Sequence, residues 1–476
     1  MRLRTLFVWN TTMQANALPP IDDLAMRPDE KRAASLMAAL YASRMLGMFM
    51  ILPTFALFAQ GEFPEASALM IGLTMGIYGL SQALLQLPFG MWSDRFGRKP
   101  LIAIGLVLFA LGSVVCALAP TMEWMMLGRA LQGAGAISAV LLALLADLTR
   151  ETVRLRAMSL VGISIGFSFT ISLVIGPALD AVVGVRGIFW LTALMALGGL
   201  VVLYTLIPDP DIKPLSRDVQ ADTSALGVVL KDAGLLRLNF GIFALHLLLT
   251  ALFIAVPLAL VQSAGIDVMQ HWQIYLPVML VSFALMTPLI IYGEKKAQLR
   301  PIFLLSIGLL MLAEVLLWAG HDNLWLVVLA LIVFFTGFNV MEASLPSLIA
   351  KFAPAHLKGT ASGVYATSQF FGTFLGGVLG GALLGWGSFD AVFAAAIGLT
   401  LVWLAIAWGM VNPDRISSFV LPLRDEHVQT PEATKQALMS IQGVREAWVD
   451  SVGVRAYLKI DKTQVSEDNL IHWVTR

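Results

Sequence analysis

Long apolar runs alternate along the chain with short breaks that are polar or contain Gly and Pro. Each run is close to the ~20 residues that an α-helix needs to cross the hydrocarbon core of a bilayer. The pattern predicts twelve membrane spans in two sets of six, offset by about 200 residues. The spans, numbered 1 to 12 below, are expected at 36–59, 68–91, 101–119, 122–147, 156–183, 187–207, 237–264, 270–293, 301–319, 324–350, 358–386 and 389–411.

Composition supports a membrane protein and excludes several other classes. Hydrophobic residues make up 58% of the chain and charged residues 13%, about half the charge of a soluble domain. A net charge of zero argues against nucleic acid as a partner. Cys116 is the single cysteine, so no disulfide, CxxC metal site or other cofactor is expected. A phosphate-binding loop and a nucleophile–base pair are also missing from the sequence, which argues against ATP-driven transport and against an enzyme.

Lysine and arginine are concentrated on alternate connections between the spans. The connections at 60–67, 120–123, 184–186, 265–269, 320–323 and 387–388 carry one cation, Arg186. The other connections carry Arg95, Arg98, Lys99, Arg150, Arg154, Arg156, Lys213, Arg217, Lys231, Arg237, Lys295, Lys296, Arg300, Lys351 and Lys358. The positive-inside rule makes this second set cytoplasmic. Because the number of spans is even, both termini are expected in the cytoplasm.

The spans divide the chain into five segments. Residues 1–33 have no signal-peptide core and are expected to be a disordered cytoplasmic segment, with Met26 as an alternative start. Residues 34–207 form the first six-helix half and 237–411 the second. Between them, 208–236 is a cytoplasmic linker, in which 226–236 is expected as an amphipathic helix on the inner membrane surface.

Residues 417–476 have the composition of a small soluble domain. Strands are expected at 418–423, 444–450 and 454–460, and helices at 431–441 and 467–473. The order β-α-β-β-α is that of a ferredoxin-like fold that lacks or frays its last strand. The first loop, 424–427, has no cysteine, which argues against soft-metal binding. A regulatory role through a ligand, self-association and a passive tail all stay open.

The loop between spans 2 and 3 contains an unusual concentration of charge. Its sequence is Gly90-Met-Trp-Ser-Asp94-Arg95-Phe-Gly97-Arg98-Lys99. The cations satisfy the positive-inside rule, but Asp94 has no topological role. A carboxylate at the membrane boundary is costly unless it meets a cation or a helix N-terminus. This spacing resembles the signature of the major facilitator superfamily, in the loop between its second and third helices.

The resemblance covers 36–411 and extends to two further motifs. Leu127-Gly-Arg129-Ala-Leu-Gln132-Gly133-Ala-Gly135-Ala136 in span 4 is similar to a family motif whose buried arginine is linked to proton coupling in drug/proton antiporters. Gly162, Gly166, Gly176 and Pro177 in span 5 resemble the antiporter motif, although Ser172 and Asp180-Ala181 stand where glycines are usual. These small residues are expected to pack span 5 on span 8.

Taken with the C-terminal domain, the chain resembles the YajR-type branch of the superfamily. Ser43-Arg44 in span 1 and Asp147-Leu-Thr-Arg150 after span 4 are part of this resemblance. It implies a multi-pass protein of the bacterial inner membrane that exports a small molecule in exchange for protons. Asp94 is expected to dock near Gly359 at the start of span 11 in the outward-facing state, while Arg98 pairs with Asp147. These contacts would form a latch that protonation weakens; the second half has no equivalent motif.

Five ionisable residues fall inside spans, where they are functional candidates by default. They are Arg44 in span 1, Arg129 in span 4, His246 in span 7, Glu314 in span 9 and Glu342 in span 10. The resemblance places spans 1, 4, 7 and 10 around a central cavity and span 9 outside it, so Glu314 is expected to be structural. A static Arg44–Glu342 pair and a neutral, hydrogen-bonded His246 are the alternatives to roles in transport.

Spans 2 and 11 share the pattern Gly-x-Tyr-x-x-Ser-Gln. The side chains concerned are Tyr78 and Gln82 in span 2 and Tyr365 and Gln369 in span 11. Each pair is four residues apart and therefore on one helix face, where it can direct hydrogen bonds into the cavity. Met45, Met48, Phe49 and Phe370 would complete an adaptable wall for amphipathic molecules. Chance recurrence and ordinary packing are the alternatives.

Three functions are compatible with these features. An exporter that alternates access between two six-helix halves is the leading interpretation. A proton symporter or facilitator for a polar metabolite would require more polar side chains in the central spans than the sequence provides. A membrane sensor that signals through the C-terminal domain is the third.

Overall fold

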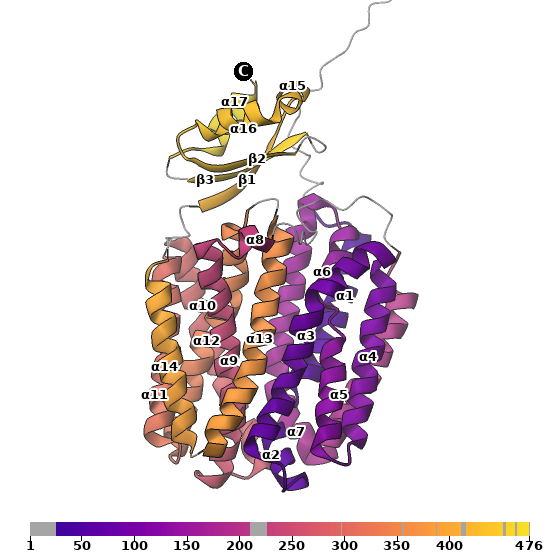
Figure 1. Ribbon diagram of the computed structural model, residues 1–476, viewed down its shortest axis with the longest axis vertical. Coiled ribbons are helices and arrows are strands. Elements are labelled where there is room, and N and C mark those ends of the chain that lie inside the picture. The colour runs from indigo at the N-terminus through magenta and orange to yellow at the C-terminus, as the bar shows by residue number, and fades with distance from the viewer. Residues whose placement is uncertain are drawn as a thin grey trace, which may run out of the picture.

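The computed structural model describes residues 25–209, 226–296, 298–354, 357–386, 388–410, 416–450, 454–461 and 464–475. Figure 1 shows two groups of long, roughly parallel helices side by side, with a small domain of helices and strands at one end of the bundle. The expectations for residues 1–24 and for most of the central linker fall outside the described residues.

The helices confirm the predicted arrangement of spans. The first half contains α1 (Pro28–Phe49), α2 (Leu52–Glu62), α3 (Ala68–Phe96), α4 (Arg98–Leu118), α5 (Met122–Ala134), α6 (Ser138–Asp147) and α7 (Glu151–Thr205). After the short α8 (Leu226–Val229), the second half contains α9 (Ala233–Gln262), the 3-10 turn η3 (Val268–Gln270), α10 (His271–Lys295), α11 (Leu299–Gly320), α12 (Leu324–Phe352), α13 (Lys358–Trp386) and α14 (Phe389–Trp408). Eleven helical segments of the described chain are long and apolar enough to cross a membrane, and α7 contains two spans, which makes twelve.

Several spans are interrupted at residues whose chemistry explains the break. Span 1 divides into α1 and α2 just before Pro53, which lacks a backbone N–H. Span 4 divides at 135–137, between α5 and α6. Within α7, Gly184 has a φ of 69°, a left-handed conformation that glycine adopts without strain, and this residue separates spans 5 and 6.

Two boundaries at the end of the bundle that carries the C-terminal domain differ from the prediction. The first helix begins at Pro28 rather than near residue 34, because proline suits the first helical turn and Glu30 is tied down. Glu30 is only 3% exposed, and its Oε1 accepts a hydrogen bond of 2.9 Å from Nε of Arg150 at the start of α7. The stretch 226–236 is not one amphipathic helix, since α8 ends at Val229 and α9 begins at Ala233.

The two halves meet along a seam of glycines between α3 and α13. A Cβ atom added at Gly72 would lie 2.1 Å from the Gly377 carbonyl oxygen, and one added at Gly76 would lie 2.5 Å from that of Phe374. On another face of α13, Gly372 approaches the backbone of α9 equally closely. Lipid provides little hydrophobic drive for helices to associate, so this close backbone approach supplies van der Waals contact instead.

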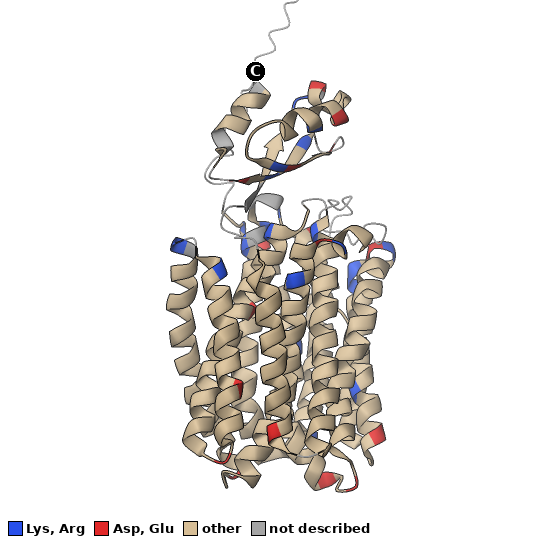
Figure 2. Cartoon of the chain, turned by 60° about the vertical axis from the view of Figure 1, so that its left-hand side comes forward, with Lys and Arg blue, Asp and Glu red and all other residues tan. Residues whose placement is uncertain are grey.

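Charge is distributed unevenly between the two ends of the bundle. Figure 2 shows Lys and Arg gathered mainly at the end that carries the small domain, while Asp and Glu are found at both ends. Arg186, the exception at the opposite end, is neutralised locally. Its Nη2 lies 2.9 Å from Oε1 of Glu62 and donates to the Ala119 carbonyl oxygen at 2.8 Å.

The C-terminal domain has the predicted order of elements. It contains β1 (Ile416–Pro422), α15 (Asp425–Gln429), α16 (Pro431–Met439), β2 (Val444–Asp450), β3 (Arg455–Asp461) and α17 (Glu467–Thr475). The sheet is antiparallel with the order β1-β3-β2, which is a ferredoxin-like sheet without its fourth strand over the described residues. The short α15 in the first loop was not predicted. Lys459 of β3 donates a hydrogen bond to the Phe352 carbonyl oxygen, which places the domain against the end of α12.

The glycine seam makes a testable prediction about stability. Gly72→Val places a branched side chain where the α13 backbone now lies, and we expect it to lower the stability of the folded protein by roughly 1–3 kcal/mol. Gly398→Val is the matched control, because a Cβ at Gly398 has no atom within 4 Å. Thermal unfolding of both variants in detergent checks this, and equal melting temperatures would contradict the seam.

Candidate functional site

Arg44 of α1 lies at the centre of a buried polar network in the first half. It is 2% exposed. Its Nη1 donates to the Ser138 hydroxyl at 2.8 Å, and its Nη2 donates to Oε1 of Gln82 at 2.6 Å and to the Tyr78 hydroxyl at 3.1 Å. Nη2 also reaches the Gly135 carbonyl oxygen at 3.1 Å, which the break in span 4 leaves available. Over the described residues no carboxylate pairs with Arg44, so neutral oxygen atoms alone accept from its two Nη groups, while the buried Nε has no partner there.

Arg129 of α5 is the second buried guanidinium of this half and is also 2% exposed. Its Nη1 donates to Oε1 of Gln132 at 2.7 Å, and Nε2 of Gln132 donates to the Ser113 hydroxyl at 2.7 Å. The guanidinium carbon lies 4.8 Å from the centroid of the Tyr78 ring, a cation–π geometry. Tyr78 therefore contacts both arginines, and no described carboxylate forms an ion pair with either of them.

The second half has its own buried polar group around His246 of α9. The side-chain nitrogen of Gln369 lies 2.8 Å from Nε2 of this histidine, and the Ile242 carbonyl oxygen lies 3.3 Å from Nδ1. With the amide as oriented here, Gln369 donates to Nε2 and Nδ1 carries the ring hydrogen. Oε2 of Glu342 is 4.0 Å from the same Nε2. His246 is thus hydrogen-bonded, with a carboxyl group beside it.

Glu342 of α12 lies between the two halves. Its Oε2 and the Tyr365 hydroxyl are buried and have no hydrogen-bond partner among the described residues. Tyr41 of α1 is within electrostatic range of both Glu342 and Arg44. The static Arg44–Glu342 pair that the sequence left open is not formed in the described part of the chain. The carboxyl group of one half and the guanidinium of the other instead share a neighbour.

A layer of aromatic rings connects the halves next to this polar region. The ring of Phe169 in α7 lies 4.9 Å from that of Phe49 and stacks on that of Phe338 at 5.3 Å. Phe338 is in turn 6.0 Å from the ring of His246. Phe49 was predicted as part of an apolar wall, whereas Phe169 and Phe338 were missed. Phe370, with Met48 beside it, packs in the cluster around Tyr78 rather than in this layer.

The halves also meet at the end of the bundle away from the C-terminal domain. The side-chain nitrogen of Gln262 in α9 donates to Oε1 of Gln60 in α2 at 3.2 Å. A pocket of about 400 Å³ opens beside this contact, within the usual size range of small-molecule sites. It is lined by Gln60, Ala68, Leu258, Gln262, Leu384, Ser388 and Phe389.

The charged loop between spans 2 and 3 forms the contact that was expected between Arg98 and Asp147. Nε of Arg98 lies 3.0 Å from Oδ2 of Asp147, and Nη1 pairs with Asp94 and donates to the Ser93 hydroxyl at 2.6 Å. Gly97, with a φ of 95°, turns the chain so that α4 can begin at Arg98. One arginine therefore bridges two carboxylates at the end of the bundle that carries the C-terminal domain.

The remaining residues of this loop have more peripheral positions. Lys99 donates to the Ile207 carbonyl oxygen at 2.7 Å, and Arg95 lies over the ring of Phe96. A Cβ atom added at Gly90 would lie 4.0 Å from Cβ of Ala139, an ordinary van der Waals distance. The docking of Asp94 near Gly359, expected for the outward-facing state, stays a prediction.

The helix that contains span 5, α7, contacts α10, which is span 8, but the span 5 glycines do not provide the close approach that was predicted. A Cβ at Gly176 would lie 2.1 Å from the Met50 carbonyl oxygen in span 1, while Cβ atoms at Gly162 and Gly166 would meet nothing within 4 Å. The reason is the break in span 1 at Met50, which directs its backbone against α7 just before Pro177. Small residues at Gly176 thus accommodate a helix of the same half.

Glu314 lies outside the central region, as expected. It is 2% exposed within α11, and it has no ion pair or hydrogen bond to another described residue. Glu314 serves below as a control for Glu342.

Two halves of six membrane spans around buried, divided charges define a membrane transporter. Residues 37–377 match the family model described as the Major Facilitator Superfamily, and the chain belongs to this family. This confirms the resemblance on which the sequence interpretation depended.

Relatives and solved structures agree with this assignment. The chain is 42% identical to the inner membrane transport protein YajR of Escherichia coli (strain K12), over 93% of this chain and 96% of that protein. It is 28% identical to the multidrug resistance protein MdtH of Aeromonas hydrophila, over 71% and 84% of the two chains. The fold is also similar to that of a bacterial homolog of the human lysosomal transporter Spinster, solved in an inward-facing and occupied conformation. The two structures superimpose with a TM-score of 0.66 at 13% sequence identity, over 81% of this chain and 97% of the other.

The Arg98 bridge predicts a difference between two neighbouring arginines. Arg98→Ala leaves two carboxylates facing each other without a cation, and because both are partly exposed we expect a loss of roughly 1–3 kcal/mol of stability. Arg95→Ala removes an exposed cation and should change stability by at most about 0.5 kcal/mol. Thermal unfolding of the two purified variants measures this, and a melting temperature for Arg98→Ala equal to that of Arg95→Ala would refute it.

Proposed function

We propose that the protein is a proton-driven exporter of small amphipathic or lipophilic compounds, which works by alternating access between its two halves. The observation that carries this proposal is the division of buried charge. The buried guanidinium groups of Arg44 and Arg129 belong to the first half, and the carboxyl group of Glu342, whose side chain is 33% exposed but whose Oε2 is buried, belongs to the second. In this proposal the end that carries the C-terminal domain faces the cytoplasm, following the positive-inside rule.

Divided charge offers a way to couple a proton to movement. Whether a carboxyl group holds its proton in a low-dielectric site depends on the water and the charges that face it. Movement of one half against the other changes the distance from Glu342 to Arg44, and with it the affinity of Glu342 for a proton. A cationic substrate that enters the site competes with the proton for the same carboxylate. Binding of the cationic substrate is therefore coupled to release of the proton.

The surroundings of Glu342 favour a lipophilic substrate over a sugar or a carboxylate. The aromatic rings of Phe49, Phe169 and Phe338 contact one another in series, and that of Phe338 lies 6.0 Å from the ring of His246, the histidine beside Glu342. Such rings bind flat apolar molecules and organic cations. The name of MdtH, a multidrug resistance protein, is compatible with export of this kind.

Arg98 would act as a latch on the cytoplasmic side. Bridging Asp94 and Asp147 holds the inner ends of α3, α4 and α6 together. Protonation of either carboxylate removes one arm of the bridge. The latch is proposed to open and close in step with the proton that drives export.

Transport in liposomes tests the central proposal. With a pH gradient imposed and a panel of lipophilic cations, the native protein should move substrate in exchange for protons. Glu342→Gln should lose the dependence on the gradient, because an amide cannot exchange a proton, while Glu314→Gln should keep it. Gradient-independent flux in the native protein would favour a facilitator, and flux of substrate and protons in the same direction would favour a symporter. No flux with any compound would favour a sensor.

The latch makes a separate prediction. Asp94→Asn preserves the shape of the side chain but weakens its pairing with Arg98. We expect a folded protein with a near-native melting temperature whose gradient-driven export falls at least tenfold, the effect of about 1.4 kcal/mol. Full export by this variant in the same liposomes would exclude the latch.

A further inference from the structure

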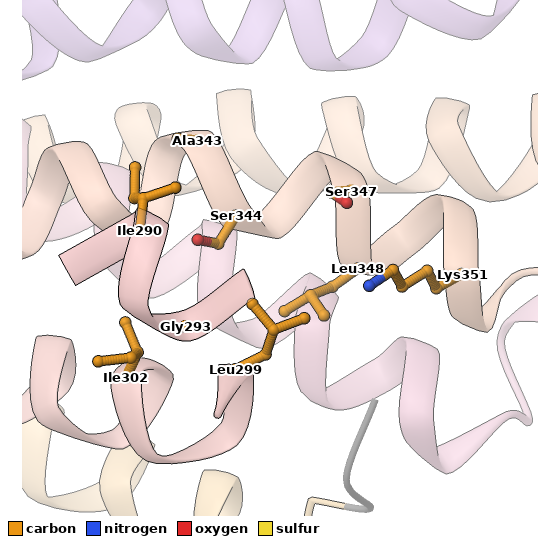
Figure 3. A pocket seen from close by; sticks show the side chains of 9 residues that line it. All are labelled: Ile290, Gly293, Leu299, Ile302, Ala343, Ser344, Ser347, Leu348 and Lys351. Atoms are coloured by element: carbon orange, nitrogen blue, oxygen red, sulfur yellow. The ribbon is translucent and has the colours of Figure 1, made fainter. Parts of the chain in front are cut away.

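A small pocket lies at the end of the second half that faces the C-terminal domain. It has a volume of about 50 Å³ and is enclosed by the ends of α10, α11 and α12 (Figure 3). Its walls are mostly apolar, except for the hydroxyl groups of Ser344 and Ser347 and the ammonium group of Lys351. The remaining lining residues are Ile290, Gly293, Leu299, Ile302, Ala343 and Leu348.

The three polar groups of this pocket have no partner in the described parts of the chain. Serine and threonine inside a helix often donate to the carbonyl one turn earlier, as Thr336 of the same helix does to Ile332 at 2.7 Å. Neither Ser344 nor Ser347 has such a bond among the described residues. Figure 3 shows the side chain of Lys351 extending back along α12 towards Leu348. A cation and two hydroxyls are thus available for a ligand.

The corresponding corner of the first half shows what this pocket lacks. Because the second half repeats the first, α10, α11 and α12 correspond to α3, α4 and the pair α5–α6. In the first half, Arg98 fills the corner between Asp94 and Asp147. In the second half, the last turn of α12 carries Lys351 in place of an acid. The charge at the helix end is reversed, and no described carboxylate pairs with it.

The volume of the pocket and the cations near it indicate what kind of ligand fits. A volume of 50 Å³ is far below the roughly 300–1,000 Å³ of a site for a drug-sized molecule. At about 10–15 Å³ for each water-sized group, it admits a few such groups, as many as the oxygens of one phosphate. Lys295, Lys296 and Arg300 are close in sequence to the lining residues Gly293 and Leu299, in a segment with one acid, Glu294. The local field therefore favours an anion.

We propose that this pocket binds the phosphate group of an anionic phospholipid from the cytoplasmic leaflet. Lys351 supplies the charge, and Ser344 and Ser347 donate hydrogen bonds to the phosphate oxygens. Exposed apolar side chains on the adjoining faces, such as Ile291 of α10 and Leu305 of α11, provide a surface for the acyl chains. Basic pockets between helices on the cytoplasmic side of membrane proteins bind lipid headgroups in this way.

Such a lipid would connect the inner ends of spans 8, 9 and 10, as Arg98 connects spans 2, 3 and 4. The site is on the same helix as Glu342, so lipid composition would influence the helix that carries the proposed proton carrier. This inference concerns binding and does not depend on proton-driven export.

Lipid binding to the purified full-length chain tests the inference. Native mass spectrometry and thermal unfolding in detergent would compare added phosphatidylglycerol with phosphatidylethanolamine. Lys351→Gln should weaken binding of phosphatidylglycerol about fivefold, the effect of one lysine near a phosphate. Lys31→Gln is the matched control, because it removes the same charge from an exposed position on α1 in the first half, which does not line the pocket. An equal loss in both variants would show diffuse attraction only and overturn the site.

A serine double variant and a comparison with inorganic phosphate complete the test. The double variant Ser344→Ala and Ser347→Ala changes no charge and should weaken phosphatidylglycerol binding several-fold; unchanged binding would overturn the inference even if Lys351→Gln does not fold. Inorganic phosphate should give little protection against unfolding at concentrations where phosphatidylglycerol protects fully. Equal protection by inorganic phosphate would indicate a soluble-anion site and would exclude the lipid.

Discussion

The burial of Arg44 without a carboxylate is the constraint on which the first half depends. A guanidinium in a low-dielectric interior must have its donors satisfied, or it destabilises the fold by several kcal/mol. Here the acceptors for the two Nη groups come from Tyr78, Gln82 and Ser138 and from the Gly135 carbonyl oxygen that an unbroken span 4 would not offer, and only Nε is left without a described partner. The break in span 4 and the polar face of span 2 are therefore parts of one arrangement that keeps a positive charge in the membrane.

The second half repeats this plan and changes its charges. His246 stands about 200 residues after Arg44, in the corresponding span, and again a glutamine of a Tyr-x-x-x-Gln pair bonds to it. Glu342 is added beside it, so the negative charge of the site comes from one half and the positive charge from the other. At the end of the bundle that carries the C-terminal domain the same divergence appears, since Arg98 fills one corner while Lys351 leaves the other open. The two halves share one fold but carry different charged groups at corresponding positions.

Sequence patterns predicted the features that depend on composition and local chemistry. Run lengths, cation placement and the order of the C-terminal elements were enough to predict the spans and the small domain, and spacing alone suggested that Tyr78 and Gln82 act together. The partners of these residues were not predictable, because a pattern does not show which helix lies opposite. Gly176 was therefore placed against the wrong span. Glu30 near the chain start looked solvent-exposed, and only tertiary structure buries it against Arg150.

Proton release on substrate binding tests the central claim, that one carboxyl group between the halves exchanges a proton for a cation. The purified protein would be mixed with tetraphenylphosphonium in weakly buffered detergent solution while the pH is followed and binding is measured in parallel. The account predicts that the native protein releases protons as the cation binds and that Glu342→Gln releases none. Binding without release by the native protein, or equal release by the variant, would contradict it.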